Sequence, residues 1–214
     1  DYFTDGGRRS RGIGREQTWA GGITDRALAF LDQPRDRPFL LVLTYDEPHH
    51  PFVCPQDYVE RFADASVAIG PAFEDDLADK PRLQRALADR QRRAHERKTS
   101  PDGRFIQSLY LACNAFVDDE IGTVLEAIDA RSNETLVIFT SDHGDCMGAH
   151  RLHTKGPFMY EPATRVPLMI RPPGGGSARR ASTAVTHVDL LPTMLDFAGL
   201  DCPAYLEGRR PRPE

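Results

Sequence analysis

Residues 136–158, LVIFTSDHGDCMGAHRLHTKGPF, join a short apolar run to a loop that is rich in ionisable side chains. The run at 136–140 has the length of a strand, and its continuous apolar character is typical of a strand covered on both faces. The loop after it, 141–158, holds two aspartates, three histidines and one lysine. In open α/β sheets, ligands bind beyond the carboxyl ends of the strands, so this order indicates both a fold class and the place of a site.

A second apolar run, FLLVLTY at 39–45, also has the character of a buried strand, and the polar loop DEPHHPF follows it. A third strand is expected at 165–171, where Pro167 favours the start or the edge of a strand. Helix patterns alternate with these strands at 24–33 with Thr24 as the expected N-cap, at 104–130, and at 189–200 with Gly199 at its end. This alternation predicts an α/β sandwich with a largely parallel sheet.

The segment at 72–103 is predicted to be a charged helical insertion into this pattern. Its central part, RLQRALADRQRRAHERK, is dominated by arginine and other charged residues. No aromatic residue lies between the arginines, which favours a solvated helix over a patch that binds an anionic partner.

The composition excludes several classes of protein. A hydrophobic content of 40% over 214 residues is enough for a sizeable core. The net charge of -5 makes nucleic acid and anionic membrane surfaces poor candidates as partners. The four cysteines form no C-x-x-C pair, so neither a zinc knuckle nor a disulfide framework is indicated, although pairing among them stays open. The apolar runs are much shorter than the roughly 20 residues of a membrane-spanning helix.

Asp142 and His143 directly follow the strand at 136–140 and are candidates for binding a divalent metal. A carboxylate oxygen and an imidazole nitrogen together suit half of such a coordination shell. The alternative is that Asp142 caps a helix and His143 is hydrogen-bonded locally. The preceding buried strand favours the metal. Asp145 is interpreted as a turn residue rather than as an outer acceptor.

Lys155 and the histidines of the first loop are candidates for binding an anion. The ammonium group of Lys155 would act as a compact charge for an oxyanion, although an exposed surface lysine is the simpler interpretation. His49 and His50 lie between two prolines, which restrict the backbone so that one imidazole can be aimed at an anionic ester or a leaving oxygen. Solvated loop histidines are the alternative there. His150 and His153 are interpreted as loop-packing residues.

Four segments in the same order resemble the sulfatase family of the alkaline phosphatase superfamily. They are TDRALAFLDQPRDRPFLLVLTYDEPHHPF, YLACNAFVDDEIGTVLEAI, ETLVIFTSDHGDCMGAHRLHTKGPFMYEPATRVPLMIRPPG and HVDLLPTMLDFAGL. The resemblance implies an alkaline phosphatase-like three-layer sandwich with a mostly parallel sheet. It also implies that Asp142 and His143 are metal ligands, and that Lys155 and His49 contact the sulfate group.

The chain departs from the family pattern in one important respect. Sulfatases use a formylglycine made from the first residue of C-x-P-x-R or S-x-P-x-R, and neither motif is present here. Cys54 and Cys202 precede prolines but have the wrong spacing. The family's aspartate pair, which completes the metal shell, is also missing. We therefore expect residues 1–214 to be the middle and later part of a catalytic domain, with the formylglycine motif upstream.

The resemblance implies a metal-dependent sulfuric ester hydrolase. This chain is expected to carry part of its active site and to be inactive by itself. The alternatives are a phosphonate monoester or phosphodiester hydrolase of the same superfamily, and a non-catalytic remnant that binds metal or anions. Calcium is the expected ion, with manganese or zinc open because of His143. The expected substrate is a small-molecule or carbohydrate sulfate ester. Which ester, the oligomeric state and the cellular location stay open.

Overall fold

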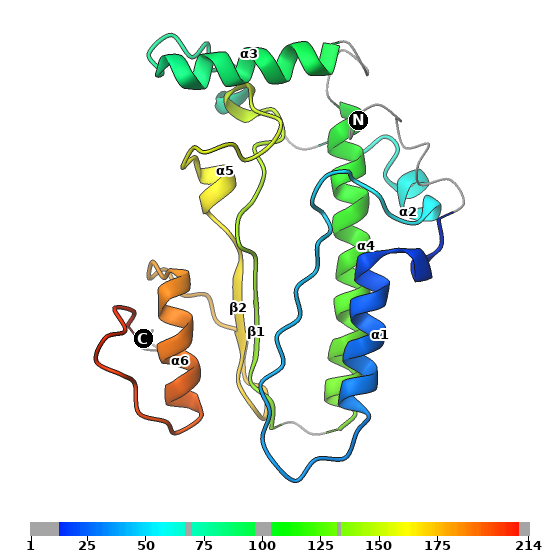
Figure 1. Ribbon diagram of the computed structural model, residues 1–214, viewed down its shortest axis with the longest axis vertical. Helices are drawn as coiled ribbons and strands as arrows, with labels where there is room; N and C mark the ends of the chain where they lie inside the picture. Colours follow the sequence, from blue (N-terminus) through cyan, green and yellow to red (C-terminus); the bar gives the residue numbers. More distant parts are fainter. Residues whose placement is uncertain (1–12, 67–69, 97–103, 132–133, 210–214) are drawn as a thin grey trace. The chain divides into compact units, whose positions relative to one another are not determined.

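The computed structural model describes residues 13–66, 70–96, 104–131 and 134–209. The chain divides into two compact units, Asp1–Gly174 and Gly175–Glu214, which are described separately below. The single catalytic domain expected over 1–214 stays a prediction. The helices and strands of the first unit are α1 (Trp19–Leu31), α2 (Gln56–Arg61), α3 (Arg82–Glu96), α4 (Arg104–Asp129), β1 (Val137–Thr140), α5 (Glu161–Thr164) and β2 (Leu168–Arg171), joined in part by the short 3-10 turns η2 (Arg15–Gln17), η3 (Pro71–Phe73) and η4 (Ala149–Arg151) (Figure 1).

Helix α1 begins earlier than its sequence pattern indicates. Its N-cap is Thr18, whose hydroxyl accepts a hydrogen bond from the N–H of Gly21 at 3.0 Å. The expected cap, Thr24, is instead buried inside the helix, where its hydroxyl lies 3.2 Å from the hydroxyl of Tyr45. The prediction of the helix was therefore right, but the prediction of its start was wrong. The first turn is also held by Glu47, which accepts hydrogen bonds from the N–H groups of Trp19 and Ala20.

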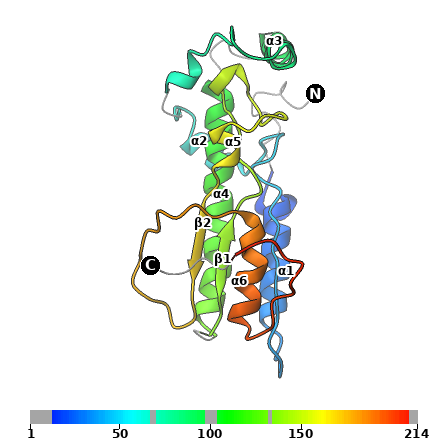
Figure 2. The same ribbon diagram turned by 90° about the vertical axis from the view of Figure 1, so that its left-hand side faces the viewer.

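The long helix α4 forms the centre of the first unit and confirms the helix expected at 104–130. Helix α1 runs alongside it in both views (Figures 1 and 2), and Ala27, Leu31 and Val124 form a buried apolar cluster. The guanidinium of Arg15 also makes two short contacts with the carboxylate of Glu120, at 2.6 and 2.9 Å. This bidentate ion pair fixes the start of α1 against α4.

The two strands of the described residues confirm two of the three predicted strands but not their predicted arrangement. β1 and β2 pair in an antiparallel ladder in which Val137 lies opposite Arg171 and Thr140 opposite Leu168. β2 starts directly after Pro167, as expected for a residue that cannot donate to a ladder. The mostly parallel sheet is not found in the described part of the chain, because the connection from β1 to β2 turns the chain back on itself.

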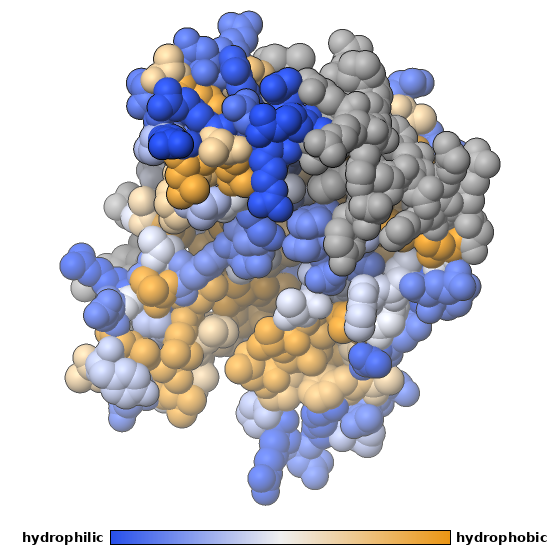
Figure 3. Space-filling view, turned by 45° about the horizontal axis from the view of Figure 1, so that its top comes forward, coloured by the Kyte–Doolittle hydropathy of each residue, from blue (hydrophilic) through white to orange (hydrophobic). Residues whose placement is uncertain are grey.

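The segment at 39–45 is extended but belongs to no strand, in contrast to the prediction. Its side chains alternate: Leu41 and Leu43 pack against the cluster between α1 and α4, whereas Leu40 and Val42 are each 73% exposed. Apolar side chains lie at the surface of the face of the molecule that is drawn in Figure 3. The apolar run correctly indicated an extended conformation, but among the described residues no backbone pairs with it.

The expected charged insertion contains α3, which packs on the loop that follows β1. Leu77 and Ala88 from the insertion share a buried cluster with Cys146, Ala149 and Leu152. All four cysteines of the chain are free thiols. No helix within the described ranges has the length and apolar character needed to cross a membrane.

The second unit contains η5 (His187–Asp189) and α6 (Leu190–Phe197), which confirm the last predicted helix. Asp189 holds the unit together locally, because its carboxylate accepts hydrogen bonds from the N–H groups of Thr186 at 2.8 Å and Arg209 at 2.7 Å. These two bonds lower the pKa of Asp189. Gly199 follows α6 with a φ of 67°, a left-handed conformation that favours glycine after a helix.

Candidate active site

The loops that follow residues 39–45 and β1 both rest on α4. From the first loop, the ring of Phe52 packs edge-on against Tyr110 of α4, with ring centres 5.6 Å apart. From the second, the backbone carbonyl of Met147 accepts a hydrogen bond from Gln107 of α4 at 2.9 Å. Phe52 and Met147 belong to the same buried cluster. Helix α4 therefore brings together the two polar loops that the sequence places far apart.

His50 lies close enough to Lys155 and Asp145 to respond to their charges. Burial lowers the pKa of His50, the neighbouring His49 and Lys155 lower it further, and Asp145 opposes the shift. His49 stacks on His50 with ring centres 4.2 Å apart, and its Nδ1 lies 2.7 Å from the carbonyl oxygen of His50. Thus His50 of the first loop lies within electrostatic range of Lys155 of the second loop.

Asp142 and His143 form a compact pair at the end of β1. The Oδ1 atom of Asp142 accepts a hydrogen bond from the backbone N–H of His143 at 2.8 Å, while Oδ2 lies 3.5 Å from Nε2 of the same histidine. The side chain of Asp142 is 84% exposed. The local hydrogen bond of His143, which was the alternative to a metal site, is therefore present. Oδ2 of Asp142 and Nε2 of His143 nevertheless lie near each other.

This spacing agrees with two donors that share one ion. Oxygen and nitrogen ligands lie about 2.0 to 2.6 Å from a divalent cation, which places neighbouring donors roughly 3 to 3.5 Å apart. The described residues contain no group of three or more His, Cys, Asp or Glu side chains suited to a metal. Asp142 and His143 thus have the spacing of two neighbouring donors in one coordination shell, and no third such side chain joins them among the described residues.

Asp145 holds the backbone of Lys155, a contact that the sequence interpretation missed. Its Oδ1 atom accepts a hydrogen bond from the N–H of Lys155 at 2.8 Å. Burial raises the pKa of Asp145, while this hydrogen bond and the charges of Lys155, His143 and His50 lower it. Asp145 therefore supports the backbone at Lys155, a role that a plain turn residue would not have.

The backbone of the second loop has an unusual conformation. Met147, His150 and Arg151 have φ values of 47°, 53° and 55°, in the left-handed region that side chains with a Cβ rarely adopt. Gly144 is needed for a close approach, because a Cβ there would lie 2.2 Å from the carbonyl oxygen of Pro162. Such conformations persist where the surrounding packing enforces them, as is common at functional sites.

Glu47, in the first loop, also supports the site, although the sequence interpretation did not single it out. Its Oε1 atom accepts hydrogen bonds from the backbone N–H groups of Trp19 at 3.0 Å and Ala20 at 3.3 Å. The carboxylate therefore closes the first turn of α1 and ties the loop that carries His49 and His50 to that helix. Burial raises the pKa of Glu47, and the two N–H donors counteract the shift.

We expect Glu47→Ala to lower the free energy of unfolding of the full-length protein by about 1 to 3 kcal/mol, because two backbone N–H groups would lose their acceptor. Urea denaturation measures this change. Glu47→Gln keeps a carbonyl acceptor and should cost less. Equal stability of Glu47→Ala and the unchanged protein would show that the carboxylate does not cap α1.

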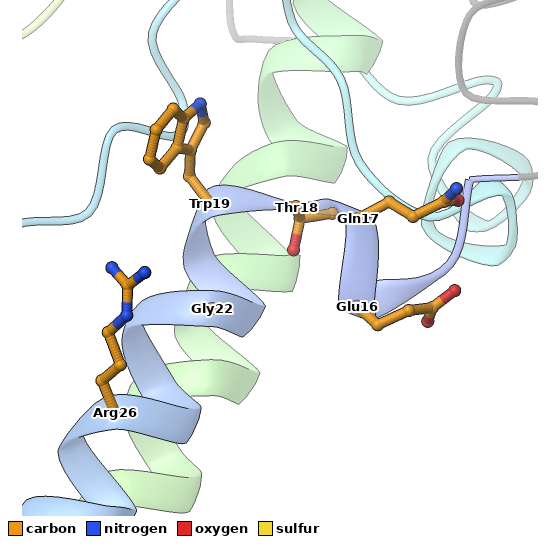
Figure 4. A pocket seen from close by; sticks show the side chains of 6 residues that line it. All are labelled: Glu16, Gln17, Thr18, Trp19, Gly22 and Arg26. Atoms are coloured by element: carbon orange, nitrogen blue, oxygen red, sulfur yellow. The ribbon is translucent and has the colours of Figure 1, made fainter.

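A separate hollow of about 300 Å³ lies at the start of α1 and contains none of the predicted site residues. It is lined by Glu16, Gln17, Thr18, Trp19, Gly22 and Arg26. Trp19 and Arg26 extend from one side of the helix, and Glu16 and Gln17 extend from η2 in another direction (Figure 4). The candidate site is therefore defined by the side chains of the two loops and not by this hollow.

Comparison with known proteins identifies the family of the chain. The family model named Sulfatase matches residues 5–200. The uncharacterized sulfatase YidJ of Escherichia coli (strain K12) is 48% identical over 194 residues, covering 89% of this chain and 38% of that protein. The N-acetylglucosamine-6-O-sulfatase of Bacteroides thetaiotaomicron is 38% identical over 107 residues, covering 49% of this chain and 19% of that protein.

Among solved structures, the phosphonate monoester hydrolase SpPMH from Silicibacter pomeroyi superposes with a TM-score of 0.78 at 28% identity, covering 94% of this chain and 42% of that one. The chain thus spans less than half the length of each of these three relatives. The match over residues 5–200 shows that the chain belongs to the sulfatase family of the alkaline phosphatase superfamily.

Proposed function

We propose that the complete protein hydrolyses sulfate esters and that this chain supplies the lysine, the histidines and two metal ligands of its active site. The observation that carries the proposal is that Phe52 and Met147, one from each loop, pack in a single buried cluster, while Asp145 fixes the backbone N–H of Lys155 at 2.8 Å. A sulfate ester is an anion, and two neighbouring loops that carry an ammonium, two imidazoles and a candidate pair of metal ligands suit such a substrate.

Lys155 would bind the sulfuryl oxygens. It is half-buried, and its backbone is fixed by Asp145, so its ammonium would meet the substrate from a defined direction. A charge-assisted contact of this kind is about twice as strong as one between neutral groups. The same group would oppose the negative charge that develops on the oxygens in the transition state.

His49 would contact the sulfate group, with His50 stacked beside it. Because burial and nearby positive charge lower the pKa of His50, this ring stays neutral to a lower pH than an exposed histidine. One imidazole of the pair could then donate a hydrogen bond while the other keeps it in place. Separate His49→Ala and His50→Ala variants would show which ring acts on the leaving oxygen.

Asp142 and His143 would supply part of the coordination shell of a divalent ion. Calcium is the first candidate for this ion, and manganese and zinc are the alternatives. When bound, the ion would neutralise charge on the sulfuryl oxygens and thereby favour attack at sulfur. The formylglycine would come from the remainder of the complete protein. There we also expect the strands that would complete an alkaline phosphatase-like three-layer sandwich with a mostly parallel sheet.

The substrate we favour is a sulfated small molecule or carbohydrate, since the N-acetylglucosamine-6-O-sulfatase is among the relatives. A phosphonate monoester hydrolase is the second candidate, because the similarity to SpPMH covers 94% of this chain. Both substrates present tetrahedral anionic centres, so the same lysine and metal ligands suit either one.

Turnover of an aryl sulfate and of a phosphonate monoester by the full-length protein, both with saturating divalent ion, tests the proposal. We expect kcat/KM for the sulfate to exceed that for the phosphonate by at least about tenfold, a difference of roughly 1.4 kcal/mol in the barrier. The reverse ratio would favour the second candidate. Hydrolysis of neither ester by protein shown to contain metal would support a non-catalytic remnant.

A further inference from the structure

We propose that Gln91 of α3 is a positioning residue that aims Lys155 at the sulfuryl group. The inference rests on the proposed function and extends it to the charged insertion, to which that function assigns no part. The insertion would thus contribute to the active site through a neutral amide rather than through its arginines.

Gln91 contacts two consecutive residues that precede Lys155. Its Oε1 atom accepts a hydrogen bond from the backbone N–H of His153 at 2.8 Å, and its Nε2 atom donates to the hydroxyl of Thr154 at 3.3 Å. A single side-chain amide therefore holds both the main chain and a side chain just before the lysine. Because the amide presents its donor and acceptor in a fixed plane, it restrains the direction in which the chain enters Lys155.

The position of Gln91 is itself fixed by the packing of α3. Gln84 lies two turns earlier on the same face and is buried, with its Nε2 donating to the hydroxyl of Tyr160. The ring of Tyr160 stacks on His150 at 3.6 Å between ring centres, and His150 Nδ1 lies 2.7 Å from a carboxylate oxygen of Asp75. These contacts attach the first half of α3 to the second loop, so Gln91 is carried on an anchored helix.

The other side of the lysine is held by a different element. Asp145 accepts the N–H of Lys155, and Gly156 approaches α3 so closely that a Cβ there would lie 3.3 Å from Leu87. Lys155 is therefore bracketed by Gln91 before it, Leu87 after it and Asp145 at its own backbone. Removing one of these supports would widen the range of positions available to the ammonium without removing its charge.

The test uses three variants of the full-length protein and one control. Gln91→Ala should raise the inhibition constant of inorganic sulfate about tenfold and lower kcat/KM for an aryl sulfate by a similar factor, as expected for the loss of two hydrogen bonds that act on the binding group. Gln91→Glu keeps the acceptor for His153 but loses the donor, so we expect a smaller effect. Thr154→Val removes only the hydroxyl and should resemble Gln91→Glu. Arg90→Ala, at an exposed neighbour on α3, should leave both constants unchanged.

A double variant separates positioning of Lys155 from a general loss of structure. In a Lys155→Ala background, Gln91→Ala should have no further effect on sulfate inhibition, because the group that it positions is gone. A tenfold effect that persists in that background would overturn the inference, as would normal sulfate inhibition in a folded Gln91→Ala protein. An unchanged protein that hydrolyses no sulfate ester would instead refute the proposed function. If Gln91→Ala does not fold, the same cycle with Thr154→Val decides.

Discussion

Asp142→Ala should leave the full-length protein without its divalent ion and with kcat/KM for sulfate esters reduced at least about 1000-fold. The loss corresponds to roughly 4 kcal/mol of transition-state stabilisation, a magnitude expected when a metal centre that neutralises reacting oxygens is dismantled. The physical reason is local. Oδ2 of Asp142 and Nε2 of His143 are 3.5 Å apart, and without the carboxylate this part of the coordination shell keeps only the imidazole and loses its negative charge.

Elemental analysis of the purified protein measures this prediction directly, alongside turnover of an aryl sulfate. Asp142→Asn is the matched control, because it keeps an oxygen that can accept the N–H of His143 at the turn while it removes the charge. We expect it to retain metal more weakly than the unchanged protein but better than Asp142→Ala. Unaltered metal content in Asp142→Ala would show that the aspartate is not a ligand.

Lys155→Ala should lower kcat/KM for sulfate esters by roughly 100-fold to 1000-fold and weaken inhibition by inorganic sulfate. A charge-assisted contact in a shielded site contributes a few kcal/mol, and Lys155 is half-buried beside Asp145 and His50. Its removal would leave the negative charge of Asp145 close to an anionic substrate, which adds to the cost.

Steady-state kinetics with sulfate as a competing ligand measure both effects. Lys155→Arg keeps the positive charge but changes the geometry of the donors, so partial recovery is expected. Metal content should stay normal in both variants, which distinguishes this prediction from the first one. Inhibition by sulfate that is equally strong in Lys155→Ala would assign the anion site to other residues.

Elements with a strong local pattern could be predicted from the sequence. Helix α4 extends over Arg104–Asp129 as its apolar spacing indicates, and β1 and β2 coincide with their apolar runs. In each case the residues that determine the conformation are neighbours in the chain. The start of α1 could not be predicted in this way, because its first N–H groups are satisfied by Glu47, about 28 residues later.

The same distinction applies to the candidate site. The two loops and their ionisable residues are visible in the sequence, because each follows an apolar run. The role of Asp145 is not visible, since an aspartate before small residues is also typical of a plain turn, and only the contact with the N–H of Lys155 distinguishes it. Nor could the arrangement at 39–45 be predicted, because an apolar run indicates that side chains are covered and does not identify the strand that pairs with it.

That unpaired segment has a practical consequence. The backbone of this segment is extended, and the side chains of Leu40 and Val42 are exposed to solvent. It therefore offers unpaired backbone hydrogen-bonding groups and an apolar surface to a second copy of the chain. A preparation of these 214 residues by themselves would consequently be prone to self-association through intermolecular β pairing. Size-exclusion chromatography of this preparation would measure the self-association. Kinetic experiments should therefore use the full-length protein.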